Sequence, residues 1–535
     1  MTSYRHAPGK GLCLPESGAA EWTGALRAPA GIELASLGSA AWAERVARRA
    51  ERAIPAYGRF LSPGGPYRRL SDRPLMDKGT YIHRFPWPEL VGQNERRLFA
   101  VYGSGGSSGR IFYWPLLRSQ HRYSAWGMRK FLERWLDIRR RRTLAVNALY
   151  LGSWWSGTYL VWLLDTIALD ARYPFTAFTP GDRHEEIVEL IAGVEKGYDQ
   201  ILLCIYPSAI SHLTAVAERM GKPLPLPKLR YLTLGEPFPE RLRMALGRKA
   251  GHPPGHTFFC SSYGSTDTGL LGTESQATIA LRQLLTSNTD LAEELGIPQP
   301  VPLLFHGVSL GSHIENVGGE LCVTRWQGIP LVRYNLHDSV RLYHWRRLRA
   351  AALGSRLWRP EDEPLRAILR KSSRLLPNLI AVSGRSDRCL LLGGIKLTEA
   401  MLDAAVHSTG LEGLLTGVYF AEIRFDEEWQ HLHLDLELRG EAAPAEGLEE
   451  RIRQSILEAL FLLKPVLKEQ WEQAYRSEDH DPRRRALRVR ICPWPALSRH
   501  LGDSVKHLPI VLSGDQLGGP DSRASGSSRE PERRA

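Results

Sequence analysis

Gly103-Ser-Gly-Gly-Ser-Ser-Gly-Arg110 carries more information about this chain than any other segment, and it lies between two short apolar runs at residues 98–102 and 111–114. Small residues allow a loop to pass close to an anion, because its backbone N–H groups stay accessible. The serine hydroxyls and the Arg110 guanidinium add further donors for phosphate oxygens. We therefore interpret this segment as a phosphate-binding loop that joins two strands.

Other interpretations of the same loop make different demands on its neighbours. A Walker loop requires Lys and then Ser or Thr after the last glycine, where this chain has Arg-Ile, and a dinucleotide fingerprint requires a glycine at Ser108. Gly105-Gly-Ser-Ser-Gly109 does match the G-x-S-x-G elbow of a serine hydrolase, with Ser107 as the nucleophile. That elbow requires a helix directly afterwards, whereas residues 111–115 look extended and end in proline. A serine esterase is the less favoured alternative, and a surface loop without a function also fits the segment taken alone.

The composition limits the class of protein to which this loop can belong. With 535 residues, of which 43% are hydrophobic, the chain can bury a large core and is long enough for more than one domain. Its six cysteines form no C-x-x-C pair and no cluster at zinc-ligand spacing, which favours a reducing compartment. The first residues lack the order of a secretory signal, so we expect a cytoplasmic protein.

The net charge of +12 raises the possibility of a nucleic-acid partner. The arginines are dispersed over the whole chain and no RNA- or DNA-binding motif accompanies them, so we predict no nucleic-acid partner. A basic cleft would instead suit small anions such as ATP and CoA. Residues 143–164 contain no charge, but Asn147, Gly152 and Ser156 favour a strand, a turn and a helix start over a membrane span.

The pattern of apolar runs predicts an α/β fold. Strand-like runs at residues 201–205, 231–234 and 257–260 alternate with helical patterns. Later strand-like runs predict more local, partly antiparallel sheets, at residues 320–324, 331–334, 419–425 and 432–438. Residues 449–463 have helical spacing, and the chain from Ser513 onward is too rich in Gly, Ser, Pro and charge to fold alone.

Four further segments follow the loop, and their order links it to a known family. They are Leu234-Gly-Glu-Pro237, Ser262-Tyr-Gly-Ser-Thr-Asp267, Gly319-Glu-Leu-Cys-Val-Thr324 with Pro330-Leu-Val-Arg-Tyr-Asn-Leu-His-Asp338, and Gly384-Arg-Ser-Asp387 with Gly393-Gly-Ile-Lys396. With the loop they resemble the motifs of the adenylate-forming ligases (acyl-CoA synthetases). Ile54-Pro-Ala-Tyr57 and Pro74-Leu-Met-Asp-Lys78 look like N-terminal segments of the phenylacetate-CoA ligase branch. The resemblance covers most of residues 50–400.

This resemblance implies a fold and an activity. The fold would be α/β, with a large N-terminal domain of layered sheets and helices that includes a small β-barrel-like part, and a smaller mobile α+β C-terminal domain. We expect residues 1–384 and 385–512 to be these domains and residues 513–535 to be a disordered tail. The activity would be the ATP- and Mg²⁺-dependent conversion of a carboxylic acid to an acyl-adenylate, followed by transfer to a thiol, expected to be CoA. Relatives of this fold use other acceptors or adenylate other cofactors, and a non-catalytic nucleotide-binding relative is a further alternative.

The resemblance also implies site residues. Phosphates of ATP would lie on Ser104, Gly105, Gly106, Ser107, Ser108, Gly109 and Arg110. Adenine and ribose would contact Gly235, Glu236, Pro237, Tyr263, Asp338 and Arg385. Lys506 and Arg385 would be catalytic, Asp387 the domain hinge, Gly394 part of the CoA channel and Asp267 the metal ligand. The pocket for an aromatic acid would involve Trp154, Trp155, Ser156 and Ser261, although core packing explains the tryptophans equally well.

Several positions depart from the family pattern. Gly105 stands where the phosphate loop has Ser or Thr, and Asp267 stands where the family has glutamate. Because aspartate is one methylene shorter, it would reach a magnesium ion only through water. Arg388 replaces an acidic residue after the hinge aspartate, and the segment that ends at Lys506 only faintly resembles the family's lysine motif.

Overall fold

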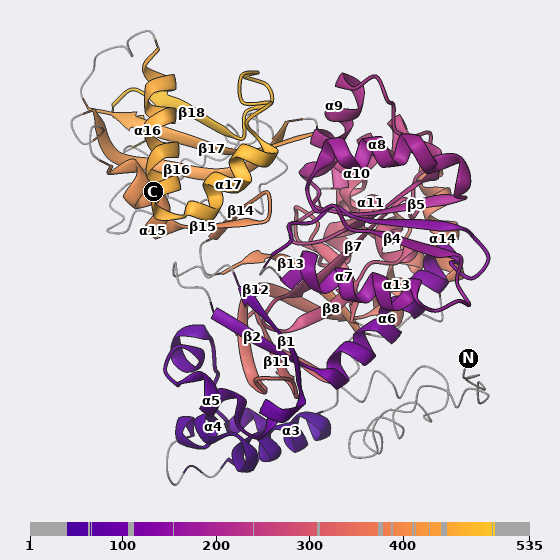
Figure 1. The fold of residues 1–535 in the computed structure, drawn as a ribbon, viewed down its shortest axis with the longest axis vertical. Helices are drawn as coiled ribbons and strands as arrows, with labels where there is room; N and C mark the ends of the chain where they lie inside the picture. The colour runs from indigo at the N-terminus through magenta and orange to yellow at the C-terminus, as the bar shows by residue number, and fades with distance from the viewer. Residues whose placement is uncertain are drawn as a thin grey trace, which may run out of the picture.

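The structure is a computed structural model of the whole chain. It describes residues 40–61, 65, 67–104, 112–152, 155–238, 240–307, 311–372, 378–386, 389–408, 411, 414–426, 428–439, 447–494 and 496–497. The described part contains an 11-stranded mixed sheet with the strand order β10-β11-β12-β13-β9-β8-β7-β6-β5-β3-β4 (Figure 1). This arrangement, with helices packed on the sheet, confirms the predicted α/β fold.

One half of this sheet is parallel and the other half is antiparallel. The parallel strands are β3 (Thr143–Asn147), β4 (Phe175–Phe178), β5 (Gln200–Ile205), β6 (Leu229–Thr233) and β7 (Phe259–Ser265). The antiparallel strands are β8 (Gly269–Thr273), β9 (Leu303–Gly307), β10 (Ser312–Val317), β11 (Glu320–Arg325), β12 (Leu331–His344) and β13 (Asn378–Arg385). The expectation of separate local sheets was therefore wrong for residues 320–334, because β11 and β12 extend the main sheet.

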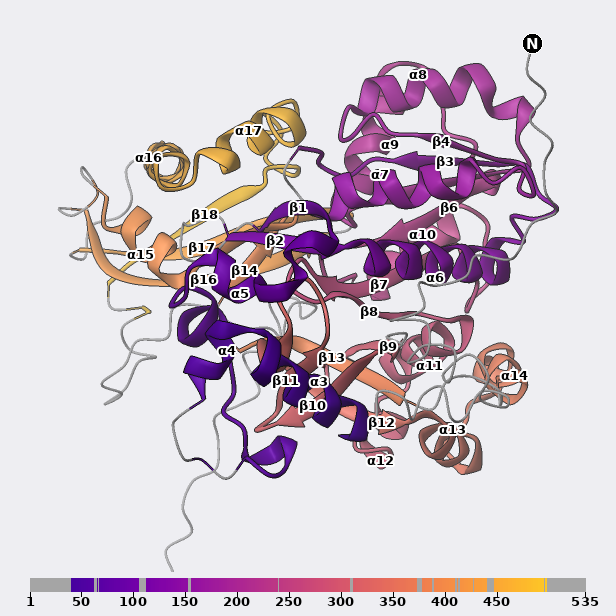
Figure 2. The same cartoon turned by 60° about the horizontal axis from the view of Figure 1, so that its bottom comes forward.

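Helices cover both faces of the parallel strands (Figure 2). On β5, Leu202 and Cys204 pack in the layer of α6 (Arg118–Leu136) and α7 (Trp155–Ala168). The alternate residues Ile201 and Leu203 pack on α8 (His184–Val194), α9 (Ala209–Arg219) and α10 (Glu240–Lys249). This alternation follows from the two-residue period of a strand, and a strand buried on both faces reads as a continuous apolar run.

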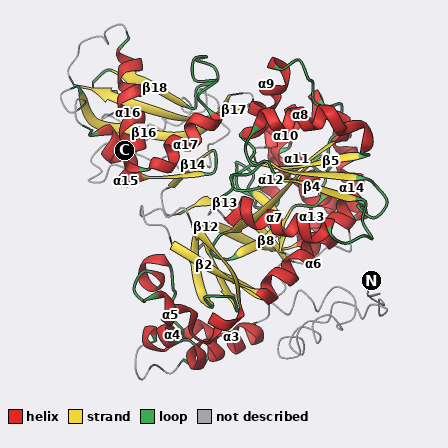
Figure 3. Ribbon diagram, in the orientation of Figure 1, coloured by secondary structure: helices red, strands yellow, loops and turns green. Residues whose placement is uncertain are grey.

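The antiparallel strands are covered by helices from two distant parts of the chain. One core joins β9 and β13 to α11 (Gln276–Ser287), α12 (Thr289–Glu294), α13 (Trp345–Gly354) and α14 (Glu363–Lys371). Another joins β11 and β12 to the N-terminal α3 (Ala40–Ala53), α4 (Pro55–Phe60) and α5 (Trp87–Val91), which gather at one end of the molecule (Figure 3). Short helical turns occupy η1 (Leu70–Asp72), η2 (Lys78–Ile82), η3 (Gly92–Arg97), η4 (Glu195–Gly197), η5 (Leu226–Lys228) and η6 (Pro360–Asp362).

The C-terminal elements share a core of their own, built from residues of the range 390–491. They are β14 (Cys389–Leu392), β15 (Ile395–Thr398), α15 (Glu399–Val406), β16 (Leu415–Asp426), β17 (Trp429–Leu438), α16 (Leu448–Leu463), α17 (Pro465–Ala474) and β18 (Leu487–Cys492). In Figure 1 they lie together at the upper left, beside the main sheet. The domain boundaries at 384/385 and 512/513 stay predictions, and the tail lies outside the described residues.

Two predictions about local structure are confirmed. The described residues 143–152 and 155–168 contain β3 and α7, and no helix of the described chain is both long and apolar enough to cross a membrane. The segments that flank the glycine-serine loop are strands β1 (Leu98–Ser104) and β2 (Phe112–Leu117), paired antiparallel with Ser104 opposite Phe112. Because the strand β2 stands where a nucleophile elbow requires a helix, the esterase built on Ser107 is not supported.

Candidate active site

Polar side chains from two other strands of the sheet meet the side chain of Asp338. Tyr263 comes from β7, Asp338 from β12 and Arg385 from β13, where Arg385 is the register partner of Asp338. The Tyr263 hydroxyl donates to Asp338 Oδ2 at 2.5 Å, and Arg385 Nη1 donates to Asp338 Oδ1 at 2.9 Å. The structure therefore brings together three residues that the resemblance assigned to adenine and ribose.

The surroundings of this cluster keep its charges in place. Burial, and the nearby Asp338 carboxylate, raise the pKa of Tyr263 well above its usual range, so this phenol is a neutral donor. Arg385 is fixed further by a 3.0 Å hydrogen bond to the Leu336 carbonyl. The Tyr263 ring stacks on Phe305, with ring centroids 5.3 Å apart. A carboxylate offers about four lone-pair sites, so Asp338 has acceptor capacity for additional hydroxyl groups.

Two glycines bring the main sheet and the C-terminal hairpin β14–β15 against one tyrosine. Gly235, after β6, has φ +80°, and a Cβ there would lie 2.7 Å from Tyr206 Cε1. Gly394, between β14 and β15, has φ +76°, and its Cβ would lie 2.9 Å from the same atom. The predicted adenine segment and the predicted CoA-channel residue therefore lie on the same aromatic ring. Only glycine permits this close approach without strain.

Glu236, predicted to contact the nucleotide, is engaged by protein groups instead. Its carboxylate accepts the Ser208 N–H at 3.1 Å and the Ser208 hydroxyl at 3.0 Å. Burial raises the pKa of Glu236 to about 7, although hydrogen bonds from Ser208 and from the Gly394 N–H act in the opposite direction. The side chain thus links the end of β6 to the C-terminal hairpin. The Gly235 and Pro237 backbone is what this segment can offer to a ligand.

Asp267, predicted as the metal ligand, is buried and already has two partners. Its Oδ2 lies 3.1 Å from Lys78 Nζ and accepts the Tyr334 hydroxyl at 2.7 Å. No group of three or more His, Cys, Asp or Glu side chains in the described chain has the arrangement of a metal site. A magnesium ion at Asp267 would compete with the Lys78 ammonium and would need phosphate oxygens as further ligands. The described residues alone therefore do not fit a metal.

A cavity of about 1420 Å³ lies beside this cluster, and some residues of the predicted acid pocket line it. Trp155 and Ser156, at the start of α7, line it together with Arg385 and Gly394. Ser261 does not line it, because this buried hydroxyl pairs with the Thr233 hydroxyl at 2.6 Å. The Ser156 hydroxyl lies 3.2 Å from the Tyr206 hydroxyl.

Several predicted site residues lie outside the described residues. These are Gly105, Gly106, Ser107, Ser108, Gly109, Arg110, Trp154, Asp387 and Lys506, and of Ser104 only the backbone is described. The hairpin that carries the loop does pack over β12, since the Trp114 ring meets the Tyr334 ring edge-on at 6.2 Å. Tyr334 lies four positions before Asp338 on that strand.

Sequence reasoning missed four residues of this region. They are Lys78, Tyr206, Phe305 and Arg325. Tyr206 follows the last residue of the parallel strand β5, and ligands in open α/β sheets bind beyond the carboxyl ends of such strands. That position was a usable signal. Phe305 and Arg325 lie in antiparallel strands, and their local sequence carries no comparable signal.

The sequence matches no protein-family model and no curated protein. Solved structures do match. A 2-hydroxyisobutyryl-CoA ligase in complex with 2-HIB-AMP and CoA, in the thioesterification state, is similar over 88% of each chain, with 14% identity and a TM-score of 0.52. An acyl acid amido synthetase in complex with 2,4-DB is similar over 93% of this chain and 95% of its own, with 12% identity and a TM-score of 0.44. The first of these similarities confirms the fold that the resemblance to adenylate-forming ligases implied.

Proposed function

We propose that this chain activates a carboxylic acid with ATP to an acyl-adenylate and then transfers the acyl group to a thiol, CoA. The observation that carries the proposal is the meeting of Tyr263, Asp338 and Arg385 at one carboxylate. These residues are 75 and 47 positions apart in the chain. They match, one by one, the positions that bind adenine and ribose in the family that the sequence resembles. The narrower assignment to the phenylacetate-CoA ligase branch is part of the same proposal.

In the first step, a substrate carboxylate oxygen attacks the α-phosphorus of ATP, and the bond to pyrophosphate breaks. Asp338 would accept the ribose hydroxyls, and the Tyr263 ring would lie against adenine. The loop from Ser104 to Arg110 would hold the departing phosphates. Negative charge builds up during the attack, and Arg385 and Lys506 are the cations assigned to offset it.

In the second step, the thiol sulfur attacks the acyl carbon, the thiol proton is lost, and the bond to AMP breaks. The Gly394 backbone would border the arm that carries the thiol. Asp387 would be the hinge about which the C-terminal elements rotate between the two steps. Magnesium at Asp267 would require that carboxylate to exchange Lys78 for the ion and ATP phosphates to complete the shell, and no step is routed through it.

The proposal is tested by exchange of labelled pyrophosphate into ATP with a panel of aryl, alkyl and dicarboxylic acids. Exchange that depends on one acid class, followed by AMP release on addition of CoA, is the expected result. Exchange without thioester formation would indicate a different acceptor. ATP binding without exchange on any acid would favour the non-catalytic nucleotide-binding alternative and would refute the ligase.

The role of Lys506 can be tested separately, because adenylation and thioester formation can be measured one at a time. Lys506→Ala is expected to depress adenylation by about a hundred-fold or more, while thioester formation from a supplied acyl-adenylate changes little. Lys468→Ala, on the exposed face of α17, is the matched control. Equal losses in both steps would contradict the assigned role.

A further inference from the structure

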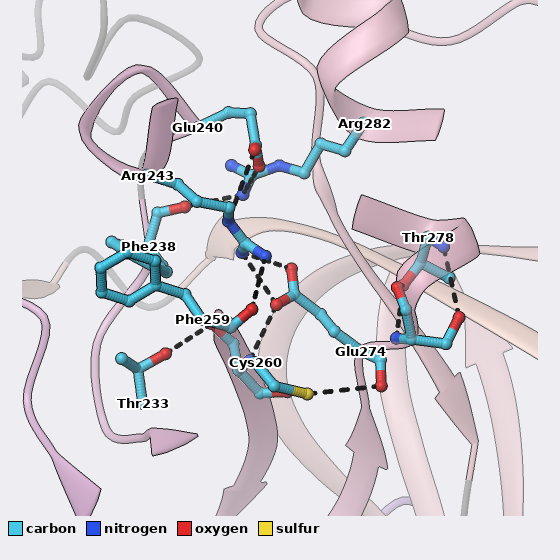
Figure 4. Close-up of polar contacts among 11 residues, drawn as sticks. Thr233, Phe238, Glu240, Arg243, Phe259, Cys260, Glu274, Thr278 and Arg282 are labelled. Atoms are coloured by element: carbon cyan, nitrogen blue, oxygen red, sulfur yellow. Dashed lines mark hydrogen bonds and ion pairs between the residues drawn. The ribbon is translucent and has the colours of Figure 1, made fainter. Parts of the chain in front are cut away.

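Six arginines of the described chain are buried, and five of them contact a carboxylate. The pairs are Arg73 with Glu51, Arg243 with Glu240 and Glu274, Arg282 with Glu240, Arg333 with Glu315, and Arg453 with Glu450 and Asp479. Figure 4 shows one of these pairings, in which the Arg243 guanidinium lies between the carboxylates of Glu240 and Glu274. A buried charge is costly unless it is paired, so this pairing is the expected arrangement.

Arg325, the last residue of β11, is the exception. Arg325 is only 8% exposed, and its Nη1 donates to the Thr268 carbonyl at 2.6 Å. Among the described residues no carboxylate lies within ion-pair distance of this guanidinium. Burial lowers the pKa of Arg325, and the nearby phenols of Tyr123 and Tyr159 act in the opposite direction. Within the described part of the chain, this guanidinium therefore has a carbonyl partner but no carboxylate partner.

This guanidinium borders the cavity assigned to the acid. Gly269 stands between it and Trp155: a Cβ on Gly269 would lie 3.4 Å from Arg325 Nη1 and 3.8 Å from Trp155 Cζ2. Arg325, Trp155 and Tyr159 all line the same cavity. The site thus combines one unpaired cation with aromatic walls. An anionic group on an apolar or aromatic body is the ligand chemistry that satisfies both.

The position of Arg325 separates it from Asp338, the residue assigned to the ribose. Arg325 lies five residues along β11 from Glu320, whose register partner Ser339 adjoins Asp338. At about 3.3 Å per residue, the two places are about 16 Å apart along the strand. A group bound at Arg325 is therefore distant from Asp338, whereas it adjoins Thr268, the residue after Asp267.

We propose that Arg325 binds a second anionic group of the substrate, so that the acid is a dicarboxylic acid with an aromatic or apolar body, activated at the carboxylate that lies away from Arg325. The activation of one carboxylate rests on the proposed function, whereas the anion site at Arg325 does not. Bidentate pairing with a carboxylate is the interaction for which a guanidinium is best suited.

The test compares matched acids on the full-length protein. Phenylacetate is paired with 4-carboxyphenylacetate, benzoate with terephthalate, and hexanoate with adipate. Affinity is measured by calorimetry, first with ATP and then with a non-hydrolysable ATP analogue. Turnover is measured by pyrophosphate exchange. Wild type should bind the preferred diacid at least about ten-fold more tightly than its monoacid partner, because the guanidinium pairs with the added carboxylate. Arg325→Met should abolish that difference without weakening the monoacid, and Arg325→Lys should keep part of it.

A second measurement excludes a merely structural role. Without any acid, Arg325→Met should melt at the same temperature as wild type or higher, because it removes an unpaired buried charge. The diacid should raise the melting temperature of wild type but not of the Met variant. Loss of stability in Arg325→Met, together with unchanged preference between mono- and diacids in Arg325→Lys, would overturn the proposal.

The outcomes distinguish this inference from the proposed function. Diacid binding that depends on Arg325, without exchange on any acid, keeps the anion site and refutes the ligase. Exchange with monoacids and no preference for any diacid keeps the ligase and refutes the anion site. The absence of both diacid binding and pyrophosphate exchange would refute both proposals.

Discussion

Asp338 gains its significance from what surrounds it. In the sequence it follows a histidine near the end of a strand-like run, where an aspartate is ordinary. In the structure its two oxygens accept from a tyrosine and an arginine of two other strands, and the residue is only 8% exposed. An ionised carboxylate held in this way is preorganised for further hydroxyl donors.

Asp338→Asn should therefore weaken ATP binding while it preserves the shape of the side chain. Hydrogen bonds to a charged group contribute about 1.5–3 kcal/mol, so the Kd for ATP should rise by about ten- to a hundred-fold. Calorimetric titration measures this directly. Asp170→Asn, which removes the ion pairs with Arg172 and Arg129, is a matched control and should leave the Kd unchanged. An unchanged Kd for Asp338→Asn would contradict the assignment of the nucleotide site.

At the scale of elements, a buried ion network ties α10 and the end of β8 to β7. Arg243 Nη2 donates to both oxygens of Glu274, at 2.7 and 2.8 Å, and Glu274 also accepts the Ser261 N–H at 2.8 Å. Ser261 is two residues before Tyr263 on β7. The network therefore sets the position of the strand that carries Tyr263 into the candidate site.

Arg243→Met should destabilise the protein by about 3–5 kcal/mol, because it leaves a buried carboxylate without its partner. The double variant Arg243→Met, Glu274→Met should be more stable than Arg243→Met alone, since it removes both charges. Urea unfolding of the wild type, both single variants and the double variant measures the coupling. Strictly additive losses would show that the pair does not act as a unit.

The stability of the contact between β6 and the β14–β15 hairpin should depend on pH, because Glu236 titrates there. Its pKa is raised from 4.5 to about 7, so its stabilising contribution is present below pH 4.5 and is lost as pH rises through 7. Glu236→Gln cannot ionise and avoids this loss. Its free energy of unfolding relative to wild type should therefore increase from about pH 5 to about pH 8.

Comparison of the two proteins at each pH separates Glu236 from other titrating groups. Burial lowers the pKa of His184 to about 4 and that of His212 to about 3, and these histidines affect both proteins equally. Denaturant titrations at several pH values supply the measurement. A constant difference across this range would show that Glu236 titrates normally in the folded protein.

At the scale of the whole molecule, the C-terminal elements contact the main sheet and its helices through aromatic, polar and charged groups. The His212 ring, on α9, meets Trp429 and Tyr475 edge-on, with centroids 4.9 and 5.3 Å apart. Gly394 approaches Tyr206 too closely to permit a side chain. Under the proposed function, this contact would form and break during turnover.

Gly394→Ala should disturb this contact and impair the thiol-dependent step. A Cβ there would meet the Tyr206 ring at 2.9 Å, so the hairpin would have to move away. Thioester formation should fall by about ten-fold or more, and pyrophosphate exchange should change far less. Gly447→Ala is the matched control, since Gly447 has φ +75° and no described atom within 4 Å of its Cβ position. Equal effects of the two substitutions would indicate backbone strain and not the contact with Tyr206.

Much of the architecture follows from local patterns. The apolar run at 201–205 predicted a strand, and β5 occupies residues 200–205 because a strand buried on both faces must be apolar throughout. The helical spacing at 449–463 predicted α16, which spans 448–463. The order of five motifs was sufficient to predict the fold. Pairing was not predictable in the same way, since nothing in residues 320–344 states which strand they will lie beside.

The sequence alone determined the strands and helices, the order of the motifs and thereby the fold, because these depend on residue periodicity and on neighbours along the chain. Only the tertiary structure decided which side chains meet: Tyr263 with Asp338, Lys78 with Asp267, and Arg325 with no carboxylate of the described chain. An arginine in a surface ion pair and one buried without a partner look the same in a sequence. The difference between them is set by what lies within a few ångströms once distant segments have packed together.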